Sequence, residues 1–432
     1  MRRPSVTAAR AAAVTILAAA SVAACGLGTT GTPSTTDNGE PSGTPITVGM
    51  SLSLTGDFSA DGHACLRGYQ LWAADVNSNG GLLGRPVRLV VIDDHSNPDT
   101  ARKAYTTLIT QDHVALTLGP FSSLLTIPAA QVAHRYGYAL VEGSGTAPAV
   151  YDTRLQNLFG VSAPVAEQMV PFANWVVSLP PGQRPKTAAY TMVADPFADP
   201  PVQTAQGILE KAGITTAYSN ADAPYTTTTP AALAANADKV AATHADIVLI
   251  GSVDVPTVAA FINEFKRLHF NPKMIIAAAG PDQGQAFLNA VGTSNAYGIM
   301  VPNTWYGGYQ NALSHVMVQE YIARYGGTIS QINGDVAEAY SAGQVIADAV
   351  AGVGLNQQRI ISFLHSGGTV LNTVQGTAFW GRYVAGRPSG QNLKAASFVF
   401  QWQPIAHFVQ VLSSGGRPSP GIEAVKPAWT SN

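Results

Sequence analysis

The chain contains little charge and little cysteine, and each shortage excludes a class of protein. Only 12% of the 432 residues are charged and the formal net charge is -2, so the composition provides no basic surface for a nucleic acid. With 46% hydrophobic residues the chain can bury a large core, which excludes a disordered protein. The two cysteines, Cys25 and Cys65, are too few for a disulfide framework or a cysteine-rich zinc site.

The common catalytic motifs are also missing. Ser144 lies in the run Gly143–Gly145, which differs from the Gly-x-Ser-x-Gly nucleophile elbow. The sequence has no Walker phosphate loop and no His-Glu-x-x-His zinc helix. The glycines of Gly80–Gly84 follow a helical pattern, so they predict a turn and not a dinucleotide site. Asp93 and Asp94 end a strand, where acids are more often solvated or capping than bound to a metal. We therefore expect no enzyme activity, no cofactor and no metal site.

The N-terminus lacks an apolar run long enough to span a membrane. Three arginines precede the short apolar run Ala11–Ala20, and small residues follow as far as Cys25. This pattern predicts a secretory signal peptide over residues 1–24. The run Val22–Cys25 resembles a bacterial lipobox, which predicts cleavage before Cys25 and a lipid anchor on that residue. The alternative is an ordinary signal peptide that ends near Ala24.

The segment after Cys25 is rich in Gly, Thr, Ser and Pro. Such a composition cannot bury a core, so residues 25–45 are predicted to form a flexible tether. Mucin-like glycosylation would be an alternative use of the same residues. The last residues, 416–432, are predicted to form a C-terminal tail.

Between these segments, strand and helix patterns alternate in two consecutive arrays of similar length, which favours parallel sheets and two α/β lobes. Alternation or short buried runs predict strands at 46–52, 87–92, 114–118, 138–141, 187–193, 246–251, 274–279, 395–403 and 406–411. Apolar spacing of three and four predicts helices at 63–79, 97–112, 200–212, 231–243, 256–270, 283–291, 311–325, 334–353 and 357–366, with a further helix beginning after Ser123.

Hydroxyl groups and glycines follow two neighbouring strands of the first array. Ser122 and Ser123 come directly after the strand that ends at Gly119, and the run Glu142–Pro148 follows the next strand. The carboxyl ends of adjacent strands form the ligand crevice of an open α/β sheet, and a helix start favours an anion. The pattern therefore indicates a carboxylate cradle. Capping of a helix by Ser122 or Ser123 is the alternative.

Several motifs occur in the order and spacing typical of one family. They are the run Gly49–Gly56, the pair Gly68-Tyr69 with Asp75–Leu83, the pair Asp93-Asp94 with Asn97-Pro98, the run Gly119–Ser123 with Thr126, and the run Glu142–Pro148. From Ile46 to about Val411 the chain resembles type I periplasmic binding proteins, in particular the Leu/Ile/Val group that serves ABC importers.

This resemblance implies an α/β fold of two Rossmann-like lobes with mostly parallel central sheets and three hinge segments. It implies lobe 1 over 46–162 and 300–376 and lobe 2 over 163–299 and 377–415. The crossings are expected near Val161–Pro164, Ile299–Asn303 and Gln375–Trp380. A ligand would be held between lobes that close like a clamp.

The resemblance also implies roles for individual residues. In the first lobe Ser122, Ser123, Ser144, Gly145 and Thr146 would hold the carboxylate and part of the ammonium of an amino acid. In the second lobe Phe197 replaces the usual Tyr, which keeps a ring and loses a hydroxyl. Asp282 would pair with the ligand ammonium.

Two acids are unusual for the family. Asp61 stands where many relatives have an aromatic residue over the ligand, which leaves the side-chain specificity open. Glu142 either binds a cation on the ligand or is solvated.

The function that this pattern implies is a lipid-anchored, extracytoplasmic receptor that delivers an amino acid or similar small solute to a membrane ABC permease. We expect a monomer with no nucleic-acid partner. One alternative keeps the fold and binds an amide, urea or short organic acid. A ligand sensor is a second alternative. A hydrolase using Ser144 is a third, but no His or Asp stands at a diagnostic spacing from that serine.

Overall fold

The computed structural model describes residues 40–309, 311–422, 424 and 426–429. The predicted signal peptide, Cys25 and most of the predicted tether lie outside these residues. The end of the tether segment is bound to the body, because Ser42 N donates to Gly84 O (3.0 Å) and Arg85 Nε donates to Thr44 O (2.7 Å). None of the helices in the described ranges combines the length and apolar character needed to cross a membrane.

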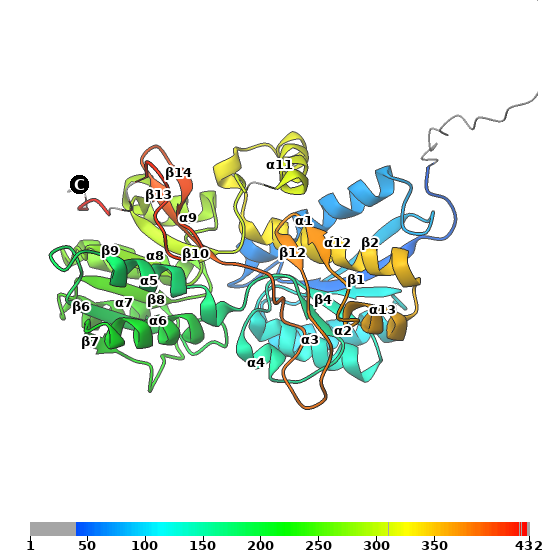
Figure 1. The fold of residues 1–432 in the computed structure, drawn as a ribbon, viewed down its shortest axis with the longest axis horizontal. Helices are drawn as coiled ribbons and strands as arrows, with labels where there is room; N and C mark the ends of the chain where they lie inside the picture. The colour runs from blue at the N-terminus through cyan, green and yellow to red at the C-terminus, as the bar shows by residue number, and fades with distance from the viewer. Residues whose placement is uncertain (1–39, 310, 423, 425, 430–432) are drawn as a thin grey trace, which may run out of the picture. The chain divides into compact units, whose positions relative to one another are not determined.

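The first lobe is built on a five-stranded parallel sheet in the order β2-β1-β3-β4-β5 (Figure 1). Its strands are β1 (Ile46–Leu52), β2 (Val87–Asp93), β3 (Leu116–Leu118), β4 (Leu140–Glu142) and β5 (Leu158–Gly160). The residues of β1 are almost all buried, as expected for a central parallel strand covered on both faces. Because the strands are parallel, the loops after β1, β3 and β4 meet at one edge of this sheet.

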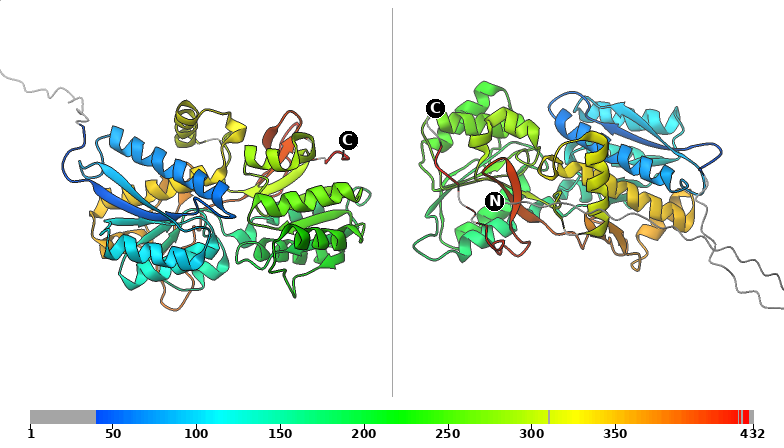
Figure 2. Two further views of the ribbon diagram at one scale, coloured as in Figure 1. Left: turned by 180° about the vertical axis from the view of Figure 1, so that it is seen from behind. Right: turned by 90° about the horizontal axis from the view of Figure 1, so that it is seen from above.

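Helices cover both faces of the first sheet (Figure 2). They are α1 (Ser59–Ser78), α2 (Pro98–Thr110), α3 (Ser123–Arg135), α4 (Pro148–Tyr151), α12 (Gly334–Val353) and α13 (Gln357–Leu364). Two further elements lie apart from the sheet: α11 (Ala312–Tyr325) packs against α1, and η2 (Ile329–Gln331) contacts the second lobe. On one face α1 packs against α12, and on the other α2 packs against α3. The sequence between 312 and 364 thus returns to the lobe in which the chain began.

The second lobe contains a seven-stranded sheet in the order β14-β13-β10-β9-β8-β6-β7. Its strands are β6 (Thr187–Met192), β7 (Thr215–Ser219), β8 (Ile247–Gly251), β9 (Met274–Ala277), β10 (Ile299–Asn303), β13 (Phe398–Gln403) and β14 (His407–Leu412). β10 pairs in parallel with β9 and antiparallel with β13, so the terminal hairpin extends an otherwise parallel sheet.

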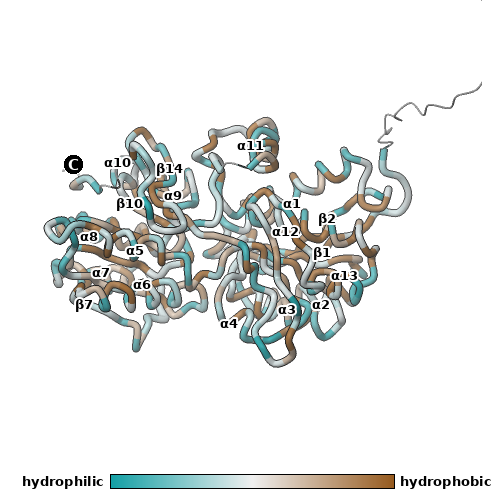
Figure 3. The backbone as a smooth tube through the Cα atoms, viewed as in Figure 1, coloured by the Kyte–Doolittle hydropathy of each residue, from teal (hydrophilic) through white to brown (hydrophobic). Residues whose placement is uncertain are grey.

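The helices of the second lobe are η1 (Val165–Glu167), α5 (Val170–Ser178), α6 (Asp199–Lys211), α7 (Pro230–Ala241), α8 (Val255–Arg267), α9 (Gln285–Val291) and α10 (Thr293–Ala296). α7, α8 and α9 cover one face of the sheet, and α5 and α6 cover the other. In Figure 3 hydrophobic residues gather along the strands and the inward sides of the helices, and hydrophilic loops lie outside. The predicted fold class, two α/β lobes with mostly parallel sheets, is confirmed.

Two of the three segments that connect the lobes meet at Gln375. Its side-chain Nε2 donates to Ser162 Oγ (3.1 Å) after β5 and to Thr304 Oγ1 (2.8 Å) after β10. Gln375 itself lies in the turn between β11 (Leu371–Thr373) and β12 (Gly376–Ala378). One side chain therefore joins these two connections.

Two of the connections differ in position from those expected. Ile299–Asn303 form strand β10 of the second sheet, so that crossing follows Asn303. After β12 the chain stays beside the first lobe, where Trp380 Nε1 donates to Gly160 O (2.6 Å) and Asn392 Nδ2 donates to Val161 O (2.7 Å). The last crossing thus comes after Asn392, later than the expected 375–380.

Candidate functional site

A cavity of about 510 Å³, including its part open to solvent, lies between the two lobes. From the first lobe it is lined by Asp61, Phe121, Ser122, Ser144, Thr146, Asp335 and Glu338. From the second lobe and the connections it is lined by Gln168, Phe197, Val253, Ala278, Ala279, Asp282, Gln283, Pro302, Asn303 and Thr304.

Three predicted hydroxyl groups meet in this cavity. Ser122 caps α3, and its Oγ accepts a hydrogen bond from Leu125 N at 3.4 Å. Ser144 Oγ donates to Glu338 Oε2 (2.8 Å). Thr146 is only 2% exposed, and its Oγ1 has no hydrogen-bond partner. An unpaired buried hydroxyl costs free energy, so Thr146 is prepared for a partner that enters the cavity.

Three other predicted residues do not line the cavity. Ser123 Oγ accepts a hydrogen bond from Ala147 N (3.0 Å), and Gly145 N donates to Glu142 Oε2. Glu142 is fully buried and also accepts a hydrogen bond from Tyr151 Oη (2.8 Å). These groups stabilise the loop between β4 and α4 on the side away from the cavity. The alternative prediction of a solvated Glu142 is therefore wrong. Burial raises the pKa of Glu142 to about 7.

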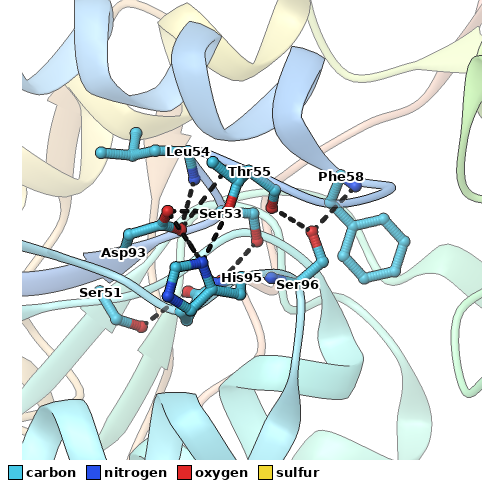
Figure 4. Close-up of polar contacts among 9 residues, drawn as sticks. Ser51, Ser53, Leu54, Thr55, Phe58, Asp93, His95 and Ser96 are labelled. Atoms are coloured by element: carbon cyan, nitrogen blue, oxygen red, sulfur yellow. Dashed lines mark hydrogen bonds and ion pairs between the residues drawn. The ribbon is translucent and has the colours of Figure 1, made fainter.

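The loop from β1 to α1 is fixed by two acids at the end of β2 (Figure 4). Asp94 accepts hydrogen bonds from Ser51 Oγ (2.9 Å) and Ser53 Oγ (2.7 Å). Asp93 accepts hydrogen bonds from Leu54 N (3.0 Å), from the Thr55 hydroxyl and from His95 N. These contacts give Asp93 and Asp94 a role in ordering the loop, and the loop in turn places the first turn of α1 at the cavity.

The first turn of α1 carries Asp61, which meets Asp335 of α12 at the lobe boundary. Gln283, from the second lobe, donates hydrogen bonds from its side-chain Nε2 to Asp61 Oδ1 and, at 3.5 Å, to Asp335 Oδ2. Asn333 Nδ2 donates to Gln283 Oε1. These hydrogen bonds connect the two lobes directly.

Burial raises the pKa values of both Asp61 and Asp335 well above the ordinary range. The two carboxyl groups also act on each other directly, and a proton shared between them relieves the repulsion of two like charges. Among the described residues, the other charges that act on this pair are those of the acids Asp254, Asp282 and Glu338, which raise the pKa values further.

Asp282 projects from the loop after β9. Its Oδ1 accepts a hydrogen bond from Gly280 N (3.0 Å), and its Oδ2 accepts one from Asn303 Nδ2 (2.8 Å). Trp402 Nε1 donates to Pro281 O (2.7 Å) and so holds the same loop against the second lobe. Burial raises the pKa of Asp282 to about 6, so the carboxyl group is ionised above neutral pH.

The remaining lining is largely apolar. Phe197, from the loop before α6, and Phe121, from the loop before α3, form part of the wall. Phe121 packs edge-on against Phe58 with ring centroids 5.6 Å apart. The cavity can therefore bury a hydrocarbon portion of a ligand beside its carboxyl groups.

Sequence reasoning missed Asp335, Glu338 and Gln283. A signal was present, because Asp335 and Glu338 stand three residues apart at the start of a mostly apolar helix and so share one face. Nothing in the sequence indicated that this face meets the loops after β1 and β4.

The comparison with known families identifies this architecture. A family described as periplasmic binding protein matches residues 45–406. The chain belongs to the periplasmic binding protein family. The resemblance noted in the sequence is confirmed, and the family is one of binding proteins and not of enzymes.

Among relatives of this periplasmic binding protein, an amino acid binding protein of Pseudomonas aeruginosa is 28% identical over 134 residues, 31% of this chain and 36% of the relative. A Leu/Ile/Val-binding protein of Rhizobium johnstonii is 31% identical over 113 residues, 26% of this chain and 30% of the relative. The chain thus matches about a third of the length of these relatives.

Solved structures share the fold over most of the chain. The substrate-binding protein LivJ of Streptococcus pneumoniae, in complex with isoleucine, has a TM-score of 0.67 at 18% identity and covers 85% of this chain and 100% of its own. A solute binding protein of R. palustris, in complex with benzoate, has a TM-score of 0.70 at 17% identity and covers 88% and 99%. At such identities the likeness concerns the fold and leaves the ligand open.

Proposed function

We propose that this periplasmic binding protein is the extracytoplasmic receptor of an ABC importer, which binds an amino acid or similar small polar solute and delivers it to a membrane permease. The observation that carries the proposal is the cavity between the lobes, where the free Thr146 hydroxyl from one lobe and the Asp282 carboxylate from the other face the same space. The amino-acid-binding relatives support the same class of solute.

In this proposal Asp282 pairs with the ligand ammonium, because a buried ammonium needs an acidic partner. Ser122, Ser144 and Thr146 supply hydroxyl donors to the polar end of the ligand, and Phe197 packs against its hydrocarbon part. Ser144 turns away from Glu338 if it donates to the ligand, since a hydroxyl has one proton.

A ligand that contacts both lobes stabilises their closed arrangement over any open one. The direct hydrogen bonds of Gln283 to Asp61 and Asp335 would then form only when the lobes are closed. The permease would distinguish loaded from empty receptor through this arrangement.

The alternative ligand class is an amide, urea or short organic acid, and the benzoate complex of a structural neighbour supports the last of these. The lining of this cavity argues against an anion, because it contains four acids and no Lys, Arg or His among the described residues. A sensor would use the same cavity and differ only in its membrane partner.

The proposal includes the predicted signal peptide over residues 1–24 and the lipid anchor on Cys25. We expect Cys25→Ala to release the protein from the membrane fraction with ligand binding unchanged. A variant that stays membrane-bound after a salt wash contradicts the anchor.

A thermal-shift screen of amino acids, amides, amines and organic acids against the purified protein tests the receptor function. For an amino-acid hit, calorimetry on Asp282→Ala should show binding weakened by about 10- to 150-fold or more, because a charged hydrogen bond contributes about 1.5–3 kcal/mol. The absence of any ligand in the screen would overturn the proposal. Unchanged affinity of Asp282→Ala for an amino acid would favour the amide or organic-acid class.

A further inference from the structure

The cavity contains more acid than a zwitterionic ligand requires. Asp61 on α1, Asp335 and Glu338 on α12, and Asp282 after β9 all line it, and the described lining contains no basic side chain. His63 and Arg67 line a separate pocket that also contacts Gln283, and Arg67 donates to Tyr321 Oη (3.0 Å). The acids come from both lobes and therefore surround the ligand space.

A second observation points to a ligand at the same place. Thr146 Oγ1 is buried, lines this cavity and has no hydrogen-bond partner. A hydroxyl in that position can donate to or accept from a bound group. The four acids and the unpaired Thr146 hydroxyl therefore line the same space.

We propose that the ligand of this cavity is a small organic cation with net positive charge, namely a diamine or a basic amino acid that carries ammonium or guanidinium groups toward both lobes. This inference rests on the proposed receptor function and specifies its ligand.

The charges favour a cation over a neutral amino acid. A zwitterion supplies one ammonium, which Asp282 can hold, and adds a carboxylate that would lie beside Glu338 and the Asp61–Asp335 pair. Like charges that lie side by side repel each other strongly in a desolvated site. A second ammonium or guanidinium group in place of that carboxylate converts the repulsion into attraction.

The titration of the acids agrees with this geometry. Burial raises the pKa of Glu338 to about 7, and the adjacent charges of Glu142 and Asp282 add to the effect, against hydrogen bonds from Ser144 and Ser162. Burial likewise raises the pKa values of Asp61, Asp335 and Cys65, and none of the neighbours that act on these groups is a cation. An entering cation would replace the protons that these carboxyl groups otherwise retain.

An organic cation is favoured over a metal ion. No group of three or more His, Cys, Asp and Glu in the described part of the chain is arranged to hold a metal. Beside the acids the lining includes the apolar side chains of Phe121, Phe197 and Val253, which a hydrocarbon chain can cover. A ligand with cationic ends and an alkyl middle uses both parts of the lining.

A matched series of ligands with similar carbon chains tests the charge. Calorimetry at pH 8 would compare 1,5-diaminopentane, lysine, norleucine and hexanoate on the purified protein. We expect the diamine or lysine to bind at least about 10-fold more tightly than norleucine, with hexanoate weakest. Tighter binding of norleucine than of both cations would overturn this inference and leave the receptor function intact. Failure of every solute in this series and in the wider screen would instead overturn the receptor function.

A variant on α12 separates charge from packing. Glu338→Gln keeps an oxygen that can accept from Ser144, and it should weaken binding of the cation by about 10-fold or more with little change for norleucine. Asp348→Asn makes the same charge change on the same helix, about 15 Å along it and away from the cavity lining, and should leave both affinities unchanged. Equal cation affinity in Glu338→Gln and the parent would contradict the inference.

Discussion

Thr146 carries the clearest mark of a binding residue in this protein, because its hydroxyl is buried and unpaired while its neighbours are engaged. By contrast, the hydroxyl groups of Ser123 and Thr126, both in α3, form hydrogen bonds with backbone groups of the protein. The difference separates Thr146, the proposed ligand-binding residue, from residues that shape the loop.

We expect Thr146→Val to weaken ligand binding by about 3- to 10-fold, because a neutral hydrogen bond contributes about 0.5–1.5 kcal/mol. The stability of the free protein should stay equal or rise, since no internal hydrogen bond is lost. Ser123→Ala is the matched control. It leaves Ala147 N–H unpaired and should lower the free energy of unfolding by about 1–3 kcal/mol. Calorimetry and denaturant unfolding check both, and a Thr146→Val variant that binds like the parent would remove Thr146 from the site.

Glu142 shows how a strand-end acid can serve structure alone. Its carboxyl group accepts hydrogen bonds from Gly145 N and Tyr151 Oη in a fully buried position. Glu142 is closely packed against Gly119, because a Cβ on Gly119 would lie 2.2 Å from the Glu142 Cβ. The Gly119 of the motif is therefore required by Glu142.

The raised pKa of Glu142 predicts a pH-dependent stability. The folded state holds this proton up to about pH 7, whereas the unfolded chain releases it near its ordinary value of 4.5. The contribution of Glu142 to stability is therefore greatest below about pH 4.5 and is lost as the pH rises to 7. We expect Glu142→Gln to gain up to about 3 kcal/mol on the parent between pH 5 and pH 8. Denaturant unfolding at the two pH values measures this difference, and a constant difference would contradict the assignment.

At the scale of elements, the close approach of α1 and α12 brings the acids of the cavity together. A Cβ on Gly68 of α1 would stand 2.3 Å from Val336 O of α12, so only glycine permits this packing. Asp61 and Asp335 lie near the ends of the two helices that meet in this way. The contact therefore sets the geometry of the carboxyl pair.

Gly68→Ala should force the helices apart and destabilise the protein by about 1–3 kcal/mol. Gly207 in α6 is the matched control, since a Cβ there has no neighbour within 4 Å. Gly207→Ala should instead stabilise the protein by about 0.5–1 kcal/mol through helix propensity. Thermal unfolding distinguishes the two, and a stabilised Gly68→Ala variant would disprove the close contact.

At the scale of the whole binding protein, the connections and the lobe-to-lobe hydrogen bonds define a closed arrangement. Gln375 joins two of the connections, and Gln283 bridges to the acids of the opposite lobe. Ser162, which accepts a hydrogen bond from Gln375, also acts on Glu338 at the cavity by lowering its pKa. In the proposed mechanism, ligand contact and lobe closure would therefore involve neighbouring residues.

We expect small-angle scattering to show a smaller radius of gyration with a confirmed ligand than without it, since closure brings the lobes together. Gln283→Ala removes the bridge without touching the connections, so its ligand-free form should be at least as expanded as the parent. An unchanged radius on ligand addition would argue against the clamp mechanism.

The sequence by itself determined the fold class and most elements, because long apolar periodicities and strand-end glycines depend on neighbours close in the chain. The elements that it did not predict include β10, which was expected to be a crossing, and β7 and α5. β7 is a short, mostly half-exposed strand, and α5 lacks the charged face that marks a surface helix.

The site was determined only in part by the sequence. Motif order placed Ser122, Ser144, Thr146, Phe197 and Asp282, and the structure brings all five to one cavity. The roles of Ser123, Gly145 and Glu142 depend on the direction in which each group points. Hydrogen bonds within the folded loop decide that direction. The part that Asp335 and Glu338 play in the site could be found only from the tertiary structure. The chain returns to the first lobe nearly two hundred residues after Ser144, and only there does α12 meet the loop that contains Ser144. Local patterns encode elements, but a ligand's electrostatic surroundings are a sum over residues that only folding brings together.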